Sequence, residues 1–211
     1  NDCMNKQTFS IKKSLNNSWS LLMSNFWKFA GLTLLLGLIG LLISFVGEQG
    51  IVFGGLSAIL RMYLMLLGLL VFIRSTQEKK FVFKKIFKEI DIKTYLYLFF
   101  VSLMVGLSIL LGLVFLLVPG IILALGLSFS SYFVAEGGVP VDSMKKSWRT
   151  TKGIKWKLLW LGMLIVLINI AGALVFGVGL LLTVPFTKLV ISDVYVNFIK
   201  KLNVKVVEPS S

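Results

Sequence analysis

Six long apolar runs follow one another along this chain, separated by short polar segments or turns. Each run is close to the roughly 20 residues that a helix needs to cross a hydrocarbon core about 30 Å thick. The runs are apolar on every face, whereas the strands of a membrane barrel alternate apolar and polar positions. The pattern therefore predicts an all-α integral membrane protein with six transmembrane helices paired as three hairpins. The runs are Phe26–Val46, Ile51–Ile73, Tyr95–Leu117, Val118–Ala135, Leu158–Leu182 and Thr183–Ile199.

Each hairpin is preceded by a segment in which apolar residues recur every three or four positions among basic and polar ones. Pro140 suits the first turn of the third such segment, and Gly153 ends it. Apolar and basic residues on opposite faces are typical of helices that lie in the headgroup layer. A cytosolic connector packed across the helix bundle predicts the same stripe and stays open as an alternative. The apolar positions are Ile11, Leu15, Trp19, Leu22 and Phe26 in the first segment, Phe83, Ile86, Phe87 and Ile90 in the second, and Val141, Met144 and Trp148 in the third.

The chain also repeats itself. Sliding the sequence along itself until Trp19 falls on Trp148 also places Ser14 on Ser143, Ser18 on Ser147 and Trp27 on Trp156. We call this displacement the longer shift. We expect these four tryptophans to act as interfacial anchors, because indole rings concentrate at membrane surfaces.

A second displacement, here called the shorter shift, superimposes Tyr63 on Phe129 and Phe129 on Tyr195. Since the longer shift is nearly twice the shorter one, the sequence predicts one unit of about 65 residues written three times. The whole chain, 1–211, is then a single membrane domain of three units, about 9–75, 76–137 and 138–204, with a flexible tail at 205–211. Hairpins of one orientation permit a pseudo-threefold axis along the membrane normal.

Charge orients the predicted spans. Of the 22 Lys and Arg residues, 20 fall in the N-terminal segment to Lys28, in Arg74–Lys93, in Lys145–Lys157 and in Lys200–Lys205. Cytoplasmic loops carry such an excess of cations, so both termini and both long loops are expected in the cytoplasm. The net charge of +13 fits attraction to anionic headgroups. Nucleic acid is not expected as a partner, because the cations flank separate helices.

Few residues of this chain offer catalytic chemistry. The sequence has no histidine and one cysteine, Cys3, which excludes His-based catalysis, zinc knuckles and iron–sulfur clusters. We therefore expect no enzymatic activity, no metal and no cofactor. Lys188 and Ser192 are one helical turn apart, but we expect Lys188 to snorkel toward the membrane surface and Ser192 to bond its own backbone.

Two charges interrupt the apolar runs at matching positions. Arg61 and Asp193 are related by twice the shorter shift, which predicts equal depth near the middle of the membrane. Because an unpaired charge there costs about 2.5 kcal/mol or more, we expect the two to pair. The pair is either a structural clasp between the first and third units or a polar centre on a substrate or ion route.

Four stretches resemble a known family. They run from Val118 to Ala124, from Phe133 to Gly137, from Ser143 to Trp148 and from Gly153 to Trp156. They are similar to a group of bacterial six-helix membrane proteins that includes the membrane domain of some glycerophosphoryl diester phosphodiesterases and stand-alone relatives. The residues of the shared motif are Pro119, Gly120, Glu136, Gly137, Ser147 and Trp148.

The resemblance implies a location in the bacterial plasma membrane and a link to phospholipids. The phosphodiesterase domain is absent from this chain, so its activity is not implied. For Glu136 we expect a cation of the following amphipathic helix as partner, with a lipid headgroup as the alternative. Gly120 after Pro119 predicts the tight outer turn between the third and fourth runs.

Three functions fit these features. The first is a non-enzymatic membrane protein that binds lipid, with anionic headgroups at the cytoplasmic face as partners, or that organises the bilayer or envelope. The second is a transporter, exporter or immunity-type subunit whose path runs near Arg61 and Asp193. The third is a structural accessory subunit with a protein partner in a larger membrane complex.

Overall fold

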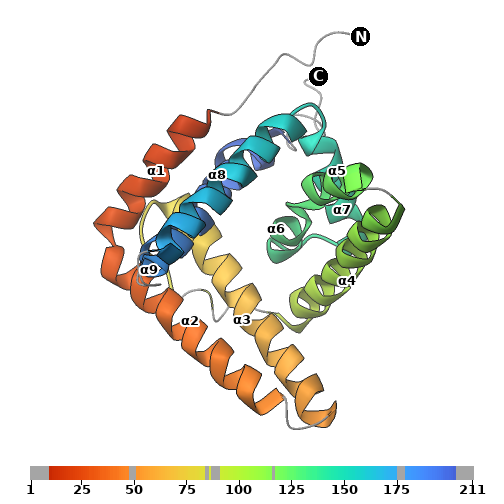
Figure 1. The fold of residues 1–211 in the computed structure, drawn as a ribbon, viewed down its shortest axis with the longest axis horizontal. Coiled ribbons are helices and arrows are strands. Elements are labelled where there is room, and N and C mark those ends of the chain that lie inside the picture. Colours follow the sequence, from red (N-terminus) through yellow and green to blue (C-terminus); the bar gives the residue numbers. More distant parts are fainter. Residues whose placement is uncertain are drawn as a thin grey trace.

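The computed structural model describes residues 10–47, 51–83, 86, 91–115, 117–174 and 179–202. Within these ranges the regular structure is helical, as the apolar runs predict (Figure 1). The helices are α1 (Ile11–Ser24), α2 (Phe26–Gly47), α3 (Ile51–Glu78), α4 (Ile92–Phe115), α5 (Leu117–Leu127), α6 (Ser130–Ala135), α7 (Pro140–Thr151), α8 (Lys155–Leu174), α9 (Leu180–Val194) and the π-helical turn η2 (Tyr195–Ile199), which continues α9.

Five of the described helices are long and apolar enough to cross a membrane. The chain is therefore an all-α, multi-pass membrane protein by the length and composition of its helices. The fourth predicted span is instead divided between two shorter helices, α5 and α6. A continuous sixth span is not confirmed. The five candidate spans are Phe26–Phe45, Ser57–Glu78, Ile92–Gly112, Lys155–Leu174 and Leu180–Leu202.

The interruption between α5 and α6 falls at Ser128 and Phe129, and hydroxyl groups of α7 bind the backbone around it. Ser147 Oγ donates to the Gly126 carbonyl oxygen at 2.8 Å, and Thr151 Oγ1 lies 3.2 Å from the same oxygen. The Phe129 N–H donates to Ser147 Oγ at 3.2 Å. Because unsatisfied backbone groups are costly inside a membrane, these contacts stabilise a break that hydropathy does not reveal.

Three helix pairs surround the centre of the view in Figure 1: α2 with α3, α4 with α5, and α8 with α9. Half of the apolar window of α9 is buried, against 17% for the windows of α4 and α8. Large apolar side chains of α2, α4 and α8 are exposed, where lipid tails would cover them. Helix α9 therefore lies inside the bundle, and α2, α4 and α8 form its outer surface.

The amphipathic helices α1 and α7 each pack on a helix pair other than the one that follows them in the chain. Helix α7 contacts α5 and α6, and α1 contacts α9. Both bury serines that the longer shift superimposes: Ser14 and Ser18 in α1, and Ser143 and Ser147 in α7. Small residues let helices approach closely, so the two helices dock in a similar way. Most of the second amphipathic segment, at 83–90, lies outside the described residues.

The buried face of α1 overlaps the predicted apolar stripe only in part. Leu22 is buried, but Ile11 and Leu15 are only partly buried and Trp19 is 47% exposed. The Trp19 ring meets the Phe186 ring of α9 edge-on, with the centroids 5.6 Å apart. The serines, together with Leu22, bring α1 against α9, and Trp19 lies at the edge of this contact.

The turn predicted at Pro119 and Gly120 is also wrong. Helix α5 begins at Leu117, so both residues lie inside its first turn. A Cβ atom at Gly112 of α4 would lie 2.9 Å from the Gly120 Cα atom, closer than side chains tolerate. The two glycines therefore allow α4 and α5 to pack tightly, and α4 and α5 form one hairpin.

Two residues that the shorter shift superimposes contact each other in the structure. The Phe129 and Tyr195 rings, which this shift superimposes, stack with their centroids 6.2 Å apart and an interplanar angle of 20°. Tyr63, the third equivalent position, is instead 36% exposed on α3. Equivalent residues of two units thus meet, while the threefold repeat itself stays a prediction.

Candidate functional site

One carboxylate joins three parts of the chain that are far apart in the sequence. Glu136, which follows α6, accepts hydrogen bonds on Oε1 from Gln77 Nε2 at 2.7 Å and from Lys200 Nζ at 2.8 Å. Its Oε2 atom accepts one from the Tyr195 hydroxyl at 2.7 Å. Because Gln77 is near the end of α3 and Lys200 follows η2, this network fixes where the ends of α3, α6 and η2 meet. Lysines follow both α3 (Lys79 and Lys80) and η2 (Lys200 and Lys201), so we call this end of the molecule the basic end.

The Glu136 network stabilises a charged carboxylate. Burial acts to raise the pKa of Glu136, but the hydrogen bonds from Lys200, Tyr195 and Gln77, with the charge of Lys200, outweigh it and hold the pKa below its usual value. The predicted partner, a cation of the amphipathic helix that follows, is wrong. The ion pair is with Lys200, which lies far beyond that helix in the sequence, and no local pattern reveals such a contact.

Three other residues of the family-like motif shape the corner between α6 and α7. Gly137 adopts a φ of +94°, a conformation that favours glycine, and turns the chain directly after Glu136. Ser147 binds the interrupted backbone before α6, and the Trp148 ring packs against Gly126 of α5. In this chain Gly137, Ser147 and Trp148 form a structural corner that positions Glu136.

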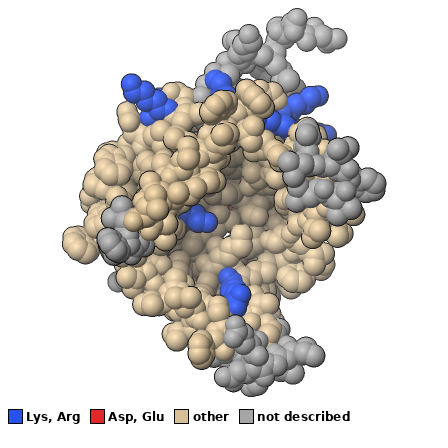
Figure 2. Space-filling view, viewed as in Figure 1, with Lys and Arg blue, Asp and Glu red and all other residues tan. Residues whose placement is uncertain are grey.

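A cavity of about 400 Å³, here called the central cavity, lies between α2, α3 and α9. Figure 2 shows a hollow near the middle of this face, with Lys or Arg side chains in it and no Asp or Glu visible. The walls of the cavity are mostly apolar, and none of its lining residues is acidic. The lining residues are Thr33, Leu36, Gly37, Gly40, Arg61, Leu64, Met65, Gly68, Leu69, Phe72, Tyr132, Val184 and Lys188.

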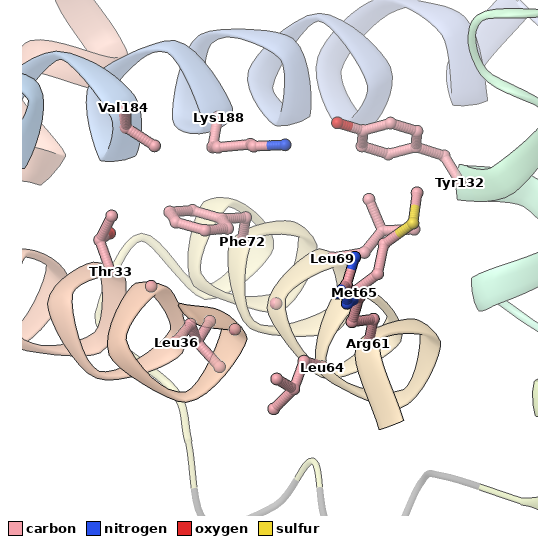
Figure 3. A pocket seen from close by; sticks show the side chains of 13 residues that line it. Thr33, Leu36, Arg61, Leu64, Met65, Leu69, Phe72, Tyr132, Val184 and Lys188 are labelled. Atoms are coloured by element: carbon pink, nitrogen blue, oxygen red, sulfur yellow. The ribbon is translucent and has the colours of Figure 1, made fainter. Parts of the chain in front are cut away.

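Two cations enter the central cavity from facing helices. Figure 3 shows Lys188 extending from α9 toward Tyr132, and Arg61 extending from α3 into the same space. Among the described residues, neither side chain has a hydrogen-bond or ion-pair partner. An unpaired charge inside a membrane costs about 2.5 kcal/mol or more. The cavity therefore combines apolar walls with positive charge that no described residue neutralises.

Arg61 and Asp193 do not form the predicted pair. The buried Asp193 carboxylate faces α1, where Oδ1 accepts hydrogen bonds from Asn17 Nδ2 at 3.4 Å and Asn197 Nδ2 at 2.8 Å. The repeat predicts how far along a helix each residue lies, but it does not predict toward which side the residue points. Arg61 lines the central cavity, and Asp193 lines a separate polar cavity between α1 and the ends of α3 and η2.

The sequence interpretation missed Lys188 as a cavity residue. We expected this side chain to snorkel to the membrane surface, but it lies opposite Arg61. The available signal was that these two cations lie well inside their apolar runs, whereas Lys28, the third cation within a run, is near its start. Ser192 also differs from expectation, because its buried hydroxyl makes no hydrogen bond to its own backbone.

The four tryptophans predicted as anchors are all partly or largely exposed. Trp27 is 85% exposed and Trp156 71%, so both rings can contact lipid. Trp148 is held more closely, because its ring packs on Gly126 and the Lys155 ammonium lies 3.4 Å from the ring centroid. The exposure fits contact with headgroups, and the depth of these rings in a bilayer stays a prediction.

Binding by charge and apolar contact is the chemistry that this arrangement supports. Within the described residues, no group of three or more His, Cys, Asp or Glu side chains could hold a metal ion. The candidate site is therefore the central cavity with Arg61 and Lys188, and the Glu136 network holds the helices around it. Comparisons of this chain with protein-family models, with curated proteins and with solved structures found no match.

Proposed function

We propose that this chain is a non-enzymatic protein of the bacterial plasma membrane that binds an anionic lipid in the central cavity. The observation that carries the proposal is the presence of Arg61 and Lys188, both unpaired among the described residues, in a cavity with apolar walls. A phosphate or carboxylate between them would neutralise both charges, and an acyl chain would cover the walls. The volume of about 400 Å³ lies within the range of roughly 300–1,000 Å³ typical of small-molecule sites.

The proposal includes an orientation in the membrane. Helices α5 and α6 together make the fourth of six crossings, the three hairpins are repeated units around a pseudo-threefold axis, and the basic end faces the cytoplasm. Arg61 and Lys188 lie nearer the starts of their spans, Ser57–Glu78 and Leu180–Leu202, than the ends. Their lipid headgroup would then come from the leaflet opposite the basic end.

Lipid retention by charge variants tests the proposal. The full chain, purified in mild detergent, is exposed to equal amounts of phosphatidylglycerol and phosphatidylcholine, and bound lipids are counted by native mass spectrometry. We expect one tightly held anionic lipid per chain, lost in the Arg61→Gln/Lys188→Gln variant. The control is Lys93→Gln, which removes an exposed cation on α4 that lines neither cavity. Equal retention by all three proteins would refute the proposal.

The orientation has its own test. Lys79→Cys places a thiol at the basic end, and Leu174→Cys places one at the opposite end of α8, where the side chain is 80% exposed. A membrane-impermeant maleimide added to intact cells, in a Cys3→Ser background, should label position 174 and leave position 79 unlabelled. Labelling of position 79 from outside would reverse the proposed orientation.

Transport is the second candidate, and one observation favours it. Helix α3 and the α9–η2 helix line the central cavity and then the polar cavity, one after the other along their lengths. A solute could use the two cavities in turn. Reconstituted vesicles distinguish the candidates: a lipid-binding protein releases no entrapped anionic solute, whereas a transporter releases one at a rate that depends on Arg61.

A further inference from the structure

The second cavity, here called the polar cavity, has a different lining from the central one. It encloses about 690 Å³ between α1, the end of α3 and the end of the α9–η2 helix. Hydroxyl, amide and charged groups form most of its surface. Its lining residues are Ser10, Lys13, Ser14, Asn17, Ser18, Ser20, Leu21, Ser24, Thr76, Lys79, Asp193, Asn197, Phe198 and Lys201.

A buried carboxylate in this cavity lacks a cation among the described residues. Asp193 is 5% exposed, and its two hydrogen bonds, from Asn17 and Asn197, both reach Oδ1. Neutral amides leave the negative charge uncompensated, and no described residue donates to Oδ2. Asn197 lies in the π-helical turn η2. Such turns are rare in proteins, and those that occur are frequently at functional sites. A ligand with a positively charged N–H donor would complete this site.

A buried hydroxyl in the same cavity also lacks a partner. Ser18 is only 2% exposed, and its hydroxyl group makes no hydrogen bond within the described residues. Because buried hydroxyl groups in proteins are nearly always hydrogen-bonded, this one points to a polar occupant. Ser18 lies one helical turn from Ser14, on the face of α1 that packs toward α9.

Three lysines line the cavity along with this carboxylate. Lys13, Lys79 and Lys201 are exposed, and none of their ammonium groups has a hydrogen-bond or ion-pair partner among the described residues. Three cations and one carboxylate leave the lining with a net charge of +2. The occupant must therefore carry an anionic group in addition to the donor that faces Asp193.

We propose that the polar cavity binds a phosphoethanolamine group, with the ammonium on Asp193 and the phosphate on Lys13, Lys79 and Lys201. Inorganic phosphate would leave the carboxylate uncompensated. Phosphocholine has no N–H to donate and prefers an aromatic cage, whereas Phe198 is the single aromatic residue of this lining. The site is independent of the anionic lipid proposed for the central cavity, because the two cavities share no lining residue.

Binding of soluble headgroups tests the inference. Isothermal titration of the full chain in detergent compares glycerophosphoethanolamine, glycerophosphocholine and glycerol phosphate. We expect the ethanolamine compound to bind at least about tenfold more tightly than either of the others, because one charge-assisted hydrogen bond changes the affinity by about that factor. Equal affinity for the ethanolamine and choline compounds would overturn the proposal.

Two variants assign the contacts. Asp193→Asn keeps the shape of the side chain and should lower the affinity for glycerophosphoethanolamine about tenfold without weakening glycerol phosphate. Lys79→Gln/Lys201→Gln changes exposed residues that folding tolerates, and it should weaken both compounds. Arg61→Gln is the control and should change neither affinity. If Asp193→Asn fails to fold, the lysine variant decides, because unchanged affinities there would also overturn the site.

A second experiment shows whether the phosphoethanolamine group belongs to a lipid or to a soluble compound. Nanodiscs that contain phosphatidylethanolamine are compared with nanodiscs of phosphatidylcholine alone, with glycerophosphoethanolamine as the competitor. Loss of soluble-compound binding only in the phosphatidylethanolamine nanodiscs means that the natural occupant is a lipid headgroup. Equal binding in both kinds of nanodisc means that the site takes a free, water-soluble phosphoethanolamine.

Discussion

The Glu136 network and the central cavity differ in how their charged side chains are partnered. At the basic end, Glu136 has three hydrogen-bond partners, one of them a cation, drawn from the ends of α3 and the α9–η2 helix. In the central cavity, Arg61 and Lys188 have no partner among the described residues. A charge that the protein pairs internally holds helices together, whereas a charge that it leaves unpaired in apolar surroundings marks a place for a ligand.

This difference predicts opposite responses to mutation. Loss of a paired charge strands its partners and destabilises the fold. Loss of an unpaired cation removes a desolvation cost and weakens binding instead. The predictions below test this contrast, from the largest expected change in the free energy of unfolding to the smallest.

Glu136→Ala should be the most destabilising of these changes, at about 3 kcal/mol. It removes hydrogen bonds to a charged group, each worth about 1.5–3 kcal/mol, with a discount because Lys200 is partly exposed. Chemical unfolding in detergent micelles measures the loss. Glu136→Gln, which keeps the shape and one acceptor oxygen, should lose about half as much, and an unchanged stability in both variants would mean that the network does not hold the helix ends.

Gly126→Ala should cost about 2 kcal/mol, because its Cβ would collide with the Trp148 ring. Gly162→Ala of α8 is the matched control, since a Cβ there meets nothing within 4 Å and alanine favours helix. Thermal unfolding followed by circular dichroism compares the two. Equal melting temperatures would show that α7 does not pack on α5 as closely as described.

The contribution of the Glu136 charge should depend on pH. Its pKa in the folded protein is lower than in the unfolded chain, so the unfolded state binds more protons in acid. The stabilisation is present above the usual carboxyl pKa of about 4.3 and is lost as the pH falls through the lower, folded value. Unfolding of the wild type and of Glu136→Gln at several pH values should show a difference of about 1.5 kcal/mol at pH 7 that disappears toward pH 3. A difference that persists in acid would contradict an ionised Glu136.

Arg61→Gln/Lys188→Gln should change the stability of the lipid-free protein least, by about 0.5 kcal/mol or less, because no partner among the described residues is lost. The wild type should gain melting temperature when phosphatidylglycerol is added, and the variant should not. Thermal shift assays with and without the lipid provide both numbers. A large loss of stability without lipid would show that the two cations have a structural role after all.

The apolar runs predict the all-α class and the approximate places of α2, α3, α4, α8 and α9. The amphipathic pattern likewise predicts α1 and α7. Sequence patterns fail where the outcome depends on contacts between distant segments. The break between α5 and α6 needs hydroxyls from α7, and Glu136 finds its cation beyond the end of η2, near the other end of the described chain.

Helix rotation is the other feature that the sequence does not reveal. The repeat places Arg61 and Asp193 at equal depth, but neighbouring helices decide that one points into the central cavity and the other toward α1. In α1, close packing of serines, with only part of the apolar stripe, selects the buried face. Charge and hydropathy therefore predict the layout of the helices, and three-dimensional packing determines the candidate site.

Filling the central cavity, without any change of charge, tests the central claim most directly. Gly37 lines the cavity, and a Cβ there meets nothing within 4 Å, so Gly37→Phe would occupy the space proposed for an acyl chain. Gly106→Phe of α4 adds the same ring at an open position outside both cavities. Native mass spectrometry with phosphatidylglycerol should show one bound lipid fewer for Gly37→Phe than for the wild type and no change for Gly106→Phe. The same lipid count in all three proteins would contradict binding in the central cavity.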